Sequence, residues 1–182
     1  MDQGLIPRRY AKALYNYALE KGTDKRVYEL MKQLAGTMMQ QQELCHAMAN
    51  PYIPAKDKTA LLATAAGAGK DDTTFADFTA LLLKNRRVDF ARQIALAYLD
   101  IFRNANNIYL VDITTAVSLD KDQTAKLHDV VQKQLGNATA EYSHHVDAQL
   151  IGGFVININS QRLDASVSNE LKQLRFKLMA DQ

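Results

Sequence analysis

Residues 67–70, with the sequence Gly-Ala-Gly-Lys, come close to a phosphate-binding loop. Such a loop has the spacing G-x-x-x-x-G-K-[ST] after a strand, because its amides hold the phosphates and its hydroxyl reaches the metal. Here Thr64 stands in the place of the first glycine, and Asp71 stands in the place of the hydroxyl. The segment also follows an expected helix. We therefore interpret it as the loop that ends a helix, and an enzyme for a phosphorylated ligand stays open only as an alternative.

The histidines and the cysteine do not have the spacing of a metal site. His144 and His145 are adjacent on an expected strand, so their side chains should point to opposite faces and cannot share an ion. The Cys45-His46 pair has no second pair at a ligand spacing, and a single cysteine excludes an internal disulfide. The motifs G-x-S-x-G and H-E-x-x-H do not occur in the sequence. We expect no catalytic residue, no metal and no cofactor.

Two basic doublets, Arg8-Arg9 and Arg86-Arg87, are the candidates for contacts with a nucleic acid. Nucleic-acid binding favours a continuous basic stripe and a domain pI above about 9. This chain has a pI near 8.6 and a formal net charge of only +2. We interpret the doublets as solvated helix ends and expect no nucleic-acid partner. A helical-bundle RNA-binding regulator stays the alternative function.

The composition of the chain is that of an ordinary globular protein. The chain has 182 residues, of which 47% are hydrophobic and 23% charged, so it is too apolar for a disordered protein. Its longest uncharged stretch is interrupted by polar residues, so we expect no transmembrane helix. The first residues lack the pattern of a signal or transit peptide. Together with the single cysteine, this leads us to expect a protein of the reducing cytosol.

The first half of the chain has the spacing of helices. Apolar residues recur three and four positions apart over residues 27–38 and 91–102, and another such stripe covers about 74–85. Pro51 and Pro54 should end one helix and begin the next, because proline lacks a backbone donor and fits the first helical turn. We expect no strand before residue 106, and we predict five or six helices packed as a bundle over residues 1–105.

The pattern changes after a short polar stretch at residues 104–107. Residues 109–117 alternate as a strand does, and a capping box of Asp120 and Gln123 predicts a helix that stops at Gly136. Further strands are expected at about 139–146 and 154–158, and a last helix from about Asp164. The order βαββα predicts a small α/β domain over residues 106–182. The predicted fold class is therefore mainly α, with a helical bundle followed by this C-terminal domain.

Three of the expected helices carry notable apolar surface. The first helix is apolar over about two thirds of its circumference, and the helix around Phe75 leaves only a narrow polar strip. Both helices either lie at the centre of a tight bundle or form a groove that receives a partner helix. The last helix has one narrow seam of Val167, Leu171, Leu174 and Leu178, which raises the same question for the second domain. A stripe that faces the core of its domain is the default explanation.

Four blocks of the sequence resemble a known family, and they occur in the right order over almost the whole chain. They are Arg9 to Tyr15 with Ala18 and Gly22, Asn50-Pro51 with Ile53 and Lys58, Phe78 to Arg87, and Val146 to Asn159 with Asp164 and Ser166. In these blocks the chain resembles the delta subunit of F-type ATP synthases, called OSCP in mitochondria. The most specific block contains the family signature residues Val146, Asp147, Leu150, Gly152, Gly153 and Ile156. Asn159 departs from the family, because many relatives have glycine there.

The resemblance implies a non-catalytic stator protein that couples rotation to proton-driven ATP synthesis. It implies an N-terminal six-helix bundle on top of the F1 head, whose first and fifth helices bind N-terminal helices of alpha subunits. The candidate groove residues are Tyr10, Ala13, Leu14, Tyr17, Phe75, Phe78 and Leu82. The C-terminal domain would bind the b subunit of the peripheral stalk. The protein would then associate with the cytoplasmic face of a bacterial inner membrane only through the complex.

Overall fold

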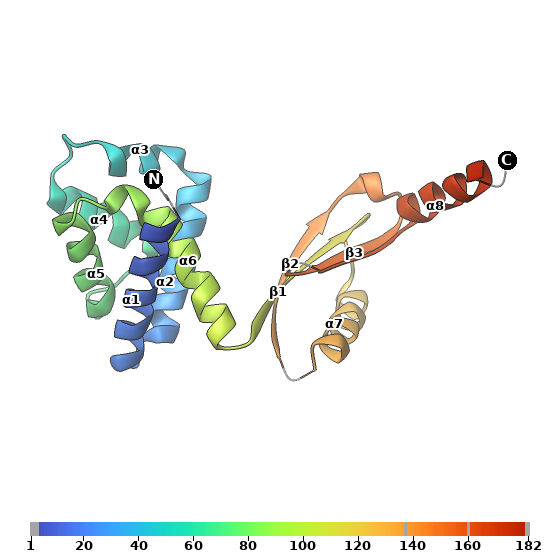
Figure 1. Ribbon diagram of the computed structural model, residues 1–182, viewed down its shortest axis with the longest axis horizontal. Coiled ribbons are helices and arrows are strands. Elements are labelled where there is room, and N and C mark those ends of the chain that lie inside the picture. The colour runs from blue at the N-terminus through green and yellow to red at the C-terminus, as the bar shows by residue number, and fades with distance from the viewer. Residues whose placement is uncertain (1–3, 137, 160, 181–182) are drawn as a thin grey trace. The chain divides into compact units, whose positions relative to one another are not determined.

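The computed structural model describes residues 4–136, 138–159 and 161–180, with the side chains of residues 177, 178 and 180 excepted (Figure 1). The chain divides into two compact units, and the boundary between them lies between Ala105 and Asn106. The first unit is helical, and the second combines helices with a sheet. Each unit has its own packed interior.

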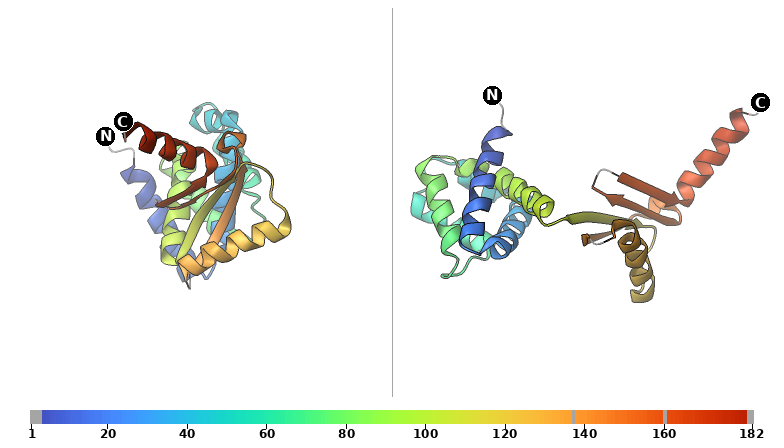
Figure 2. Two further views of the ribbon diagram at one scale, coloured as in Figure 1. Left: turned by 90° about the vertical axis from the view of Figure 1, so that its right-hand side faces the viewer. Right: turned by 60° about the horizontal axis from the view of Figure 1, so that its bottom comes forward.

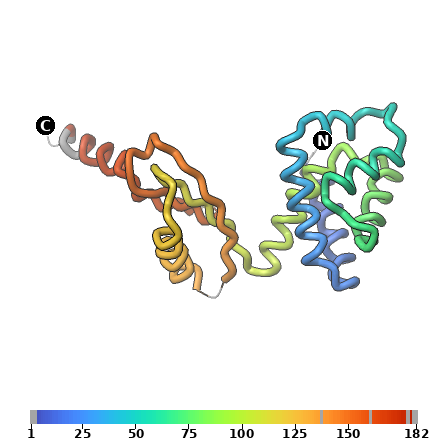
Figure 3. The backbone as a smooth tube through the Cα atoms, turned by 180° about the vertical axis from the view of Figure 1, so that it is seen from behind, coloured from blue at the N-terminus to red at the C-terminus, as the bar shows by residue number. Residues whose placement is uncertain are grey.

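The described part of the first unit contains α-helices and one short 3-10 helix. Their bounds are α1 Leu5–Glu20, α2 Asp24–Gln40, α3 Gln42–Ala49, α4 Ala55–Ala66, α5 Thr73–Lys84, η1 Val88–Phe90 and α6 Ala91–Ala105. Helix α6 packs along both α1 and α2, and α2 also packs against α4, as seen from behind in Figure 3. The inward face of α6 is mostly apolar, with Ile94, Ala95 and Tyr98 completely buried. The Tyr98 hydroxyl donates to the Asp24 carbonyl oxygen at 3.2 Å, so its polar group is satisfied inside the bundle.

The ends of α4 follow from its sequence. Pro54 stands at the N-terminal cap, and Gly67 stands at the C-terminal cap with a φ of 66°, in the left-handed region that favours glycine. The amide of Ala68 donates to the carbonyl oxygen of Ala63 at 2.8 Å, which closes the last turn. The interpretation of residues 67–70 as a loop that ends a helix is therefore confirmed.

The second unit is built on a four-stranded sheet with the order β2-β1-β3-β4. Its elements are β1 Ile108–Thr115, α7 Lys121–Leu135, β2 Thr139–Val146, η2 Ala148–Leu150, β3 Gly153–Ile158, β4 Gln161–Ser166 and α8 Val167–Ala180. Strands β1 and β2 are parallel and joined by α7, whereas β3 is antiparallel to β1 and to β4. Helix α7 lies against one face of the sheet, where its Val131 packs with Val111, Ile113, Ile156 and Ile158.

The capping box predicted for α7 is confirmed. The amide of Gln123 donates to the Asp120 carboxylate at 2.7 Å, and the Asp120 amide donates to the Gln123 side chain at 3.2 Å. The cap fixes where the crossover helix begins, because it satisfies amides that have no partner inside the helix.

The expected start of the last helix, at about Asp164, was wrong, because a strand that was not expected lies directly before the helix. Residues Gln161–Ser166 form β4, which pairs with β3 in antiparallel register, and the helix begins only at Val167. Asn159 has a φ of 50° in the connection between the two strands, a conformation that asparagine tolerates nearly as glycine does. Asp164 accepts hydrogen bonds from the amide and the hydroxyl of Ser166, and the Ser166 hydroxyl accepts one from the Asn169 amide. The order of elements is therefore βαβββα.

The seam on the last helix was also expected to face the core, and this expectation was wrong. Val167, Leu171 and Leu174 are 37%, 53% and 55% exposed, and Leu178 lies outside the described side chains. Helix α8 contacts β4 and η2 near its beginning and then continues away from the sheet (Figure 2). Nothing in the described part of the second unit covers this seam.

Candidate functional site

Helices α1 and α5 lie side by side and run in opposite directions in the first unit. The side-chain amide of Asn85, at the end of α5, donates to the Tyr10 hydroxyl at 3.1 Å. Farther along α1, the Tyr17 hydroxyl donates to the Asp77 carboxylate at 2.7 Å, and Lys21 forms an ion pair with the same carboxylate at 3.3 Å. These contacts hold the two helices at both ends of a shared surface.

The Asp77 carboxylate is well stabilised as an anion. The hydrogen bond from Tyr17 lowers the pKa of Asp77 most, and the hydrogen bond and charge of Lys21 lower it further. The Lys21 pKa is raised in turn, first by its interaction with Tyr17 and then by Asp77. The Asp77 carboxylate is therefore ionised at neutral pH, as its ion pair with Lys21 requires.

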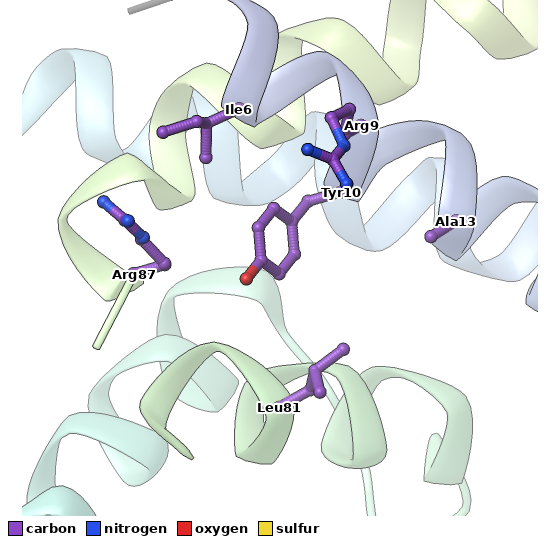
Figure 4. Close-up of a pocket in the computed structure, with 6 residues that line it drawn as sticks. All are labelled: Ile6, Arg9, Tyr10, Ala13, Leu81 and Arg87. Carbon is purple, nitrogen blue, oxygen red and sulfur yellow. The ribbon is translucent and has the colours of Figure 1, made fainter. Parts of the chain in front are cut away.

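A shallow groove of about 410 Å³ lies between α1 and α5 (Figure 4). Its lining residues are Ile6, Arg9, Tyr10, Ala13, Leu81 and Arg87. Ala13 and Leu81 are exposed, so apolar atoms face solvent between the two helices. The small side chain of Ala13 leaves space in the groove, and the guanidinium groups of Arg9 and Arg87 lie at its edge. These properties suit an amphipathic helix that carries acidic side chains beside its apolar stripe.

The structure brings together only part of the predicted groove set. Tyr10 and Ala13 line the groove, and Tyr17 is half-buried beside it and hydrogen-bonded to Asp77. The remaining predicted residues are buried in the bundle, with exposed fractions of 6% or less; they are Leu14, Phe75, Phe78 and Leu82. In the structure these four side chains belong to the packed interior of the first unit and do not line the groove.

Sequence reasoning missed four of the lining residues. Ile6 is four positions before Tyr10, and Ala13 is three positions after it, so one helical stripe contains all three. Leu81 lies on the helix around Phe75 that was expected to be apolar, but periodicity does not show that its side chain points outward. Arg9 and Arg87 belong to the doublets interpreted as solvated helix ends, and each contributes one side chain to the groove.

The family signature residues have a structural role in the second unit. The Asp147 carboxylate accepts a hydrogen bond from the Gln149 amide at 2.9 Å and so begins η2, which ends at Leu150. Gly153 has a φ of 76°, and a Cβ there would collide with the Ala165 carbonyl oxygen. A Cβ on Gly152 would come within 3.0 Å of the Val167 side chain. The two glycines therefore allow β3, β4 and the first turn of α8 to approach closely.

The other signature residues complete this junction. Ile156 is buried under α7, and Val146 is 62% exposed at the end of β2. The Val167 amide donates to the Gly152 carbonyl oxygen at 3.0 Å, which ties the start of α8 to the signature segment. The signature segment therefore holds the first turn of α8 at the sheet.

The described residues contain no cluster of three metal-ligating side chains. No group of three or more histidine, cysteine, aspartate or glutamate side chains there is arranged to hold an ion. Arg8 and Arg86 are exposed, while Arg9 and Arg87 border the apolar groove. The basic residues therefore belong to a surface that also presents apolar side chains.

Comparison with known proteins decides the family. Residues 6–178 match the family model described as the ATP synthase delta (OSCP) subunit. The chain belongs to this family. It is 37% identical to the ATP synthase subunit delta of Phocaeicola vulgatus, over 97% of this chain and 95% of that protein. It is also 33% identical to the subunit delta of a Picosynechococcus species, over 93% of this chain and 91% of that protein.

The fold of this delta-family chain also occurs in a solved structure. A chain in the cryo-EM structure of the Toxoplasma gondii mitochondrial ATP synthase hexamer matches it with a TM-score of 0.72 at 19% identity. The match covers 95% of this chain and 97% of that one. Within the described residues, every helix is too short or too polar to cross a bilayer.

Proposed function

We propose that the chain is a non-catalytic stator subunit that joins the alpha-beta head of F1 to the b-subunit peripheral stalk. The observation that carries this proposal is the pair of exposed apolar surfaces, with one in each compact unit. A connector needs two separate binding surfaces, and family membership supplies the complex in which they act. Membership also favours this role over an RNA-binding regulator.

In this proposal the first unit acts as a six-helix bundle that binds N-terminal helices of alpha subunits. The α1–α5 groove has room for a helix because Ala13 is small, and Tyr10 and Leu81 supply apolar contact on either side. Arg9 and Arg87 would select a helix with acidic residues, since complementary charge sets orientation and speeds association.

The second unit would bind the b subunit through α8. Leu171 and Leu174 are three positions apart and exposed, so they form a stripe like the seam of a coiled coil. A second helix laid on this stripe would bury both leucines, and each buried side chain of this kind is worth roughly 1.5–3 kcal/mol.

The function of such a joint is mechanical. Rotation of the central stalk applies torque to the head, and ATP synthesis requires that the head stays still. Buried apolar contacts resist this torque better than exposed ion pairs, which are worth about 1 kcal/mol or less each. The protein would then stay at the cytoplasmic face of a bacterial inner membrane through its partners.

The substitution Ala13→Asp tests the head-binding groove. It places a carboxylate where an apolar partner helix would desolvate it, which costs several kcal/mol. A titration with a peptide of the alpha N-terminus should give an affinity lower by about a hundredfold, since each 1.4 kcal/mol is tenfold. The circular dichroism of the protein should stay unchanged, because Ala13 is exposed.

The matched control is Ala60→Asp, which makes the same change at an exposed position of α4 that does not line the groove. It should leave the peptide affinity unchanged. Equal affinities of the wild type and Ala13→Asp would mean that alpha helices bind elsewhere.

A further inference from the structure

His128 on α7 and His144 on β2 meet at the surface of the second unit. Their Nε2 atoms are 3.1 Å apart, and their ring centroids are 5.2 Å apart. His128 is half-buried, and His144 is exposed at the edge strand of the sheet. The sequence could not bring this pair to attention, because the two histidines are 16 positions apart and meet only when α7 crosses over the sheet.

Both rings are held by rigid elements. The His128 ring stacks on Tyr142 with centroids 3.7 Å apart and planes 16° from parallel. The Tyr142 hydroxyl donates to the His128 backbone carbonyl oxygen at 3.3 Å, which ties α7 to β2. His144 follows Tyr142 by two positions and therefore lies on the same face of the strand. The two imidazole nitrogens are therefore positioned by regular elements, and no loop has to become ordered to bring them together.

Their separation matches that of two nitrogens bound to one metal ion. Two bonds of about 2.0–2.1 Å at a tetrahedral angle place the nitrogens about 3.3 Å apart, and a right angle brings them to about 2.9 Å. The observed 3.1 Å lies between these two values. The separation of the two Nε2 atoms therefore suits a shared ion.

We propose that His128 and His144 form a binding site for a divalent transition metal ion of the Zn²⁺, Cu²⁺ and Ni²⁺ class. Imidazole nitrogen suits these ions, and water would fill their remaining positions. Asp129 adds a nearby negative charge, which acts electrostatically on His128. The bound ion would fasten the crossover helix α7 to β2, the edge strand of the sheet.

The test is a titration of the tag-free, full-length protein with Cu²⁺, followed by calorimetry and electron paramagnetic resonance. One ion should bind per chain with the hyperfine pattern of two imidazole nitrogens. His128→Gln and His144→Gln should each lower the affinity by about tenfold or more and remove that pattern. Zn²⁺ should raise the melting temperature of the wild type but not of either variant.

His145→Gln is the matched control, because His145 is adjacent to His144 but contacts Ser143 on the opposite face of β2. It should leave the affinity and the spectrum unchanged. His144 is exposed, so its variant keeps the fold and carries the test even if His128→Gln unfolds. The proposal would be overturned if the wild type and His144→Gln bound Cu²⁺ with equal affinity. It would also be overturned if His145→Gln lost as much affinity as His144→Gln. His128 and His144 would then be a hydrogen-bonded pair only.

Discussion

The groove between α1 and α5 and the exposed seam of α8 are both apolar, but they are supported in different ways. Behind the groove, Leu14, Phe78 and Leu82 are buried, so its walls are part of a packed bundle. In α8 no residue whose side chain is described is buried, and the helix contacts its own unit mainly at its first turn. One surface is held in shape by its unit, whereas the other is a helix with little support.

This difference predicts two modes of binding. A groove that exists before binding needs little rearrangement, so most of its interaction energy appears as affinity. A helix of 14 residues without tertiary packing is only marginally stable in water. We therefore expect α8 to become ordered when its partner binds, and we expect the two surfaces to respond differently to mutation.

The largest effect should come from removing residues from Asn106 onward, which keeps the groove and discards α8. The fragment should fold with a cooperative thermal transition, because the first unit has its own core. It should still bind isolated F1 heads but fail to restore ATP-driven proton pumping when added to membrane vesicles that lack the protein. The measurement pairs the pumping in vesicles with ATPase activity in solution.

Detached heads should hydrolyse ATP at a normal rate with or without the fragment or the full chain, because the proposed role is mechanical. Full pumping with the fragment alone would contradict the need for a second surface. A fragment that is largely unfolded would contradict the independence of the first unit.

A smaller but still severe effect is expected from Gly153→Ala, which should damage only the second surface. The added methyl group would collide with the Ala165 carbonyl oxygen, and alanine is strained at a φ of 76°. Overlap and strain cost about 1–3 kcal/mol each, so the second unit should lose roughly 3 kcal/mol or more. Hydrogen exchange should show faster exchange in β3 and β4 and unchanged exchange in α1 and α5.

Gly22→Ala is the control, because Gly22 also has a positive φ but a Cβ there would meet open space. It should cost only about 1–2 kcal/mol. Equal stability losses in the two variants would mean that the approach of β3 to β4 is not what requires a glycine.

Leu171→Asp should affect binding without affecting folding. Leu171 is 53% exposed, so the free protein should keep its circular dichroism. A carboxylate buried under a b-subunit helix would cost about 3 kcal/mol, which corresponds to about a hundredfold loss of affinity. Gln173→Asp, at an exposed position off the stripe, should leave the affinity unchanged. A loss of similar size in both variants would point to net charge rather than to an apolar seam.

Local patterns predicted those elements whose causes are themselves local. The capping box of Asp120 and Gln123 predicted the start of α7, and the strand expected at about 139–146 is β2 with the same bounds. Strand β4 was missed because Leu163 is flanked by Arg162 and Asp164, and the carboxylate looked like a helix start. Its pairing with β3 is a tertiary contact, which overrides a weak local preference.

The candidate groove could be predicted as a pair of helices but not residue by residue. Periodicity shows that Leu14, Phe78 and Leu81 all lie on apolar helices, and it cannot tell which of them packs inward. That choice depends on where α6 and α2 lie, and the structure turns Leu14 and Phe78 inward and Leu81 outward.

The smallest expected effect concerns acid conditions, under which the first unit, which contains the groove, should begin to lose stability. Asp72 stands at the N-terminal cap of α5, and its carboxylate accepts two hydrogen bonds from Arg26 on α2, both of 2.9 Å. The Arg26 hydrogen bonds lower the pKa of Asp72 most, burial opposes them, and the Gly69 amide lowers it further. The unfolded chain, with an ordinary Asp pKa of about 3.9, then binds more protons than the folded one.

The stability that the contact between Asp72 and Arg26 contributes is therefore complete above about pH 4. It is lost as the pH falls through the lowered pKa of Asp72. Arg26 is about half exposed, so the contribution is about 1 kcal/mol or less. Asp72→Asn should lower the free energy of unfolding at pH 7 by this amount and flatten the acid limb of the profile, measured by urea unfolding between pH 2 and 7. Asp71→Asn, which removes an exposed carboxylate beside it, should change neither. If the free energy of unfolding falls as steeply with pH in Asp72→Asn as in the wild type, other carboxylates cause the loss of stability in acid.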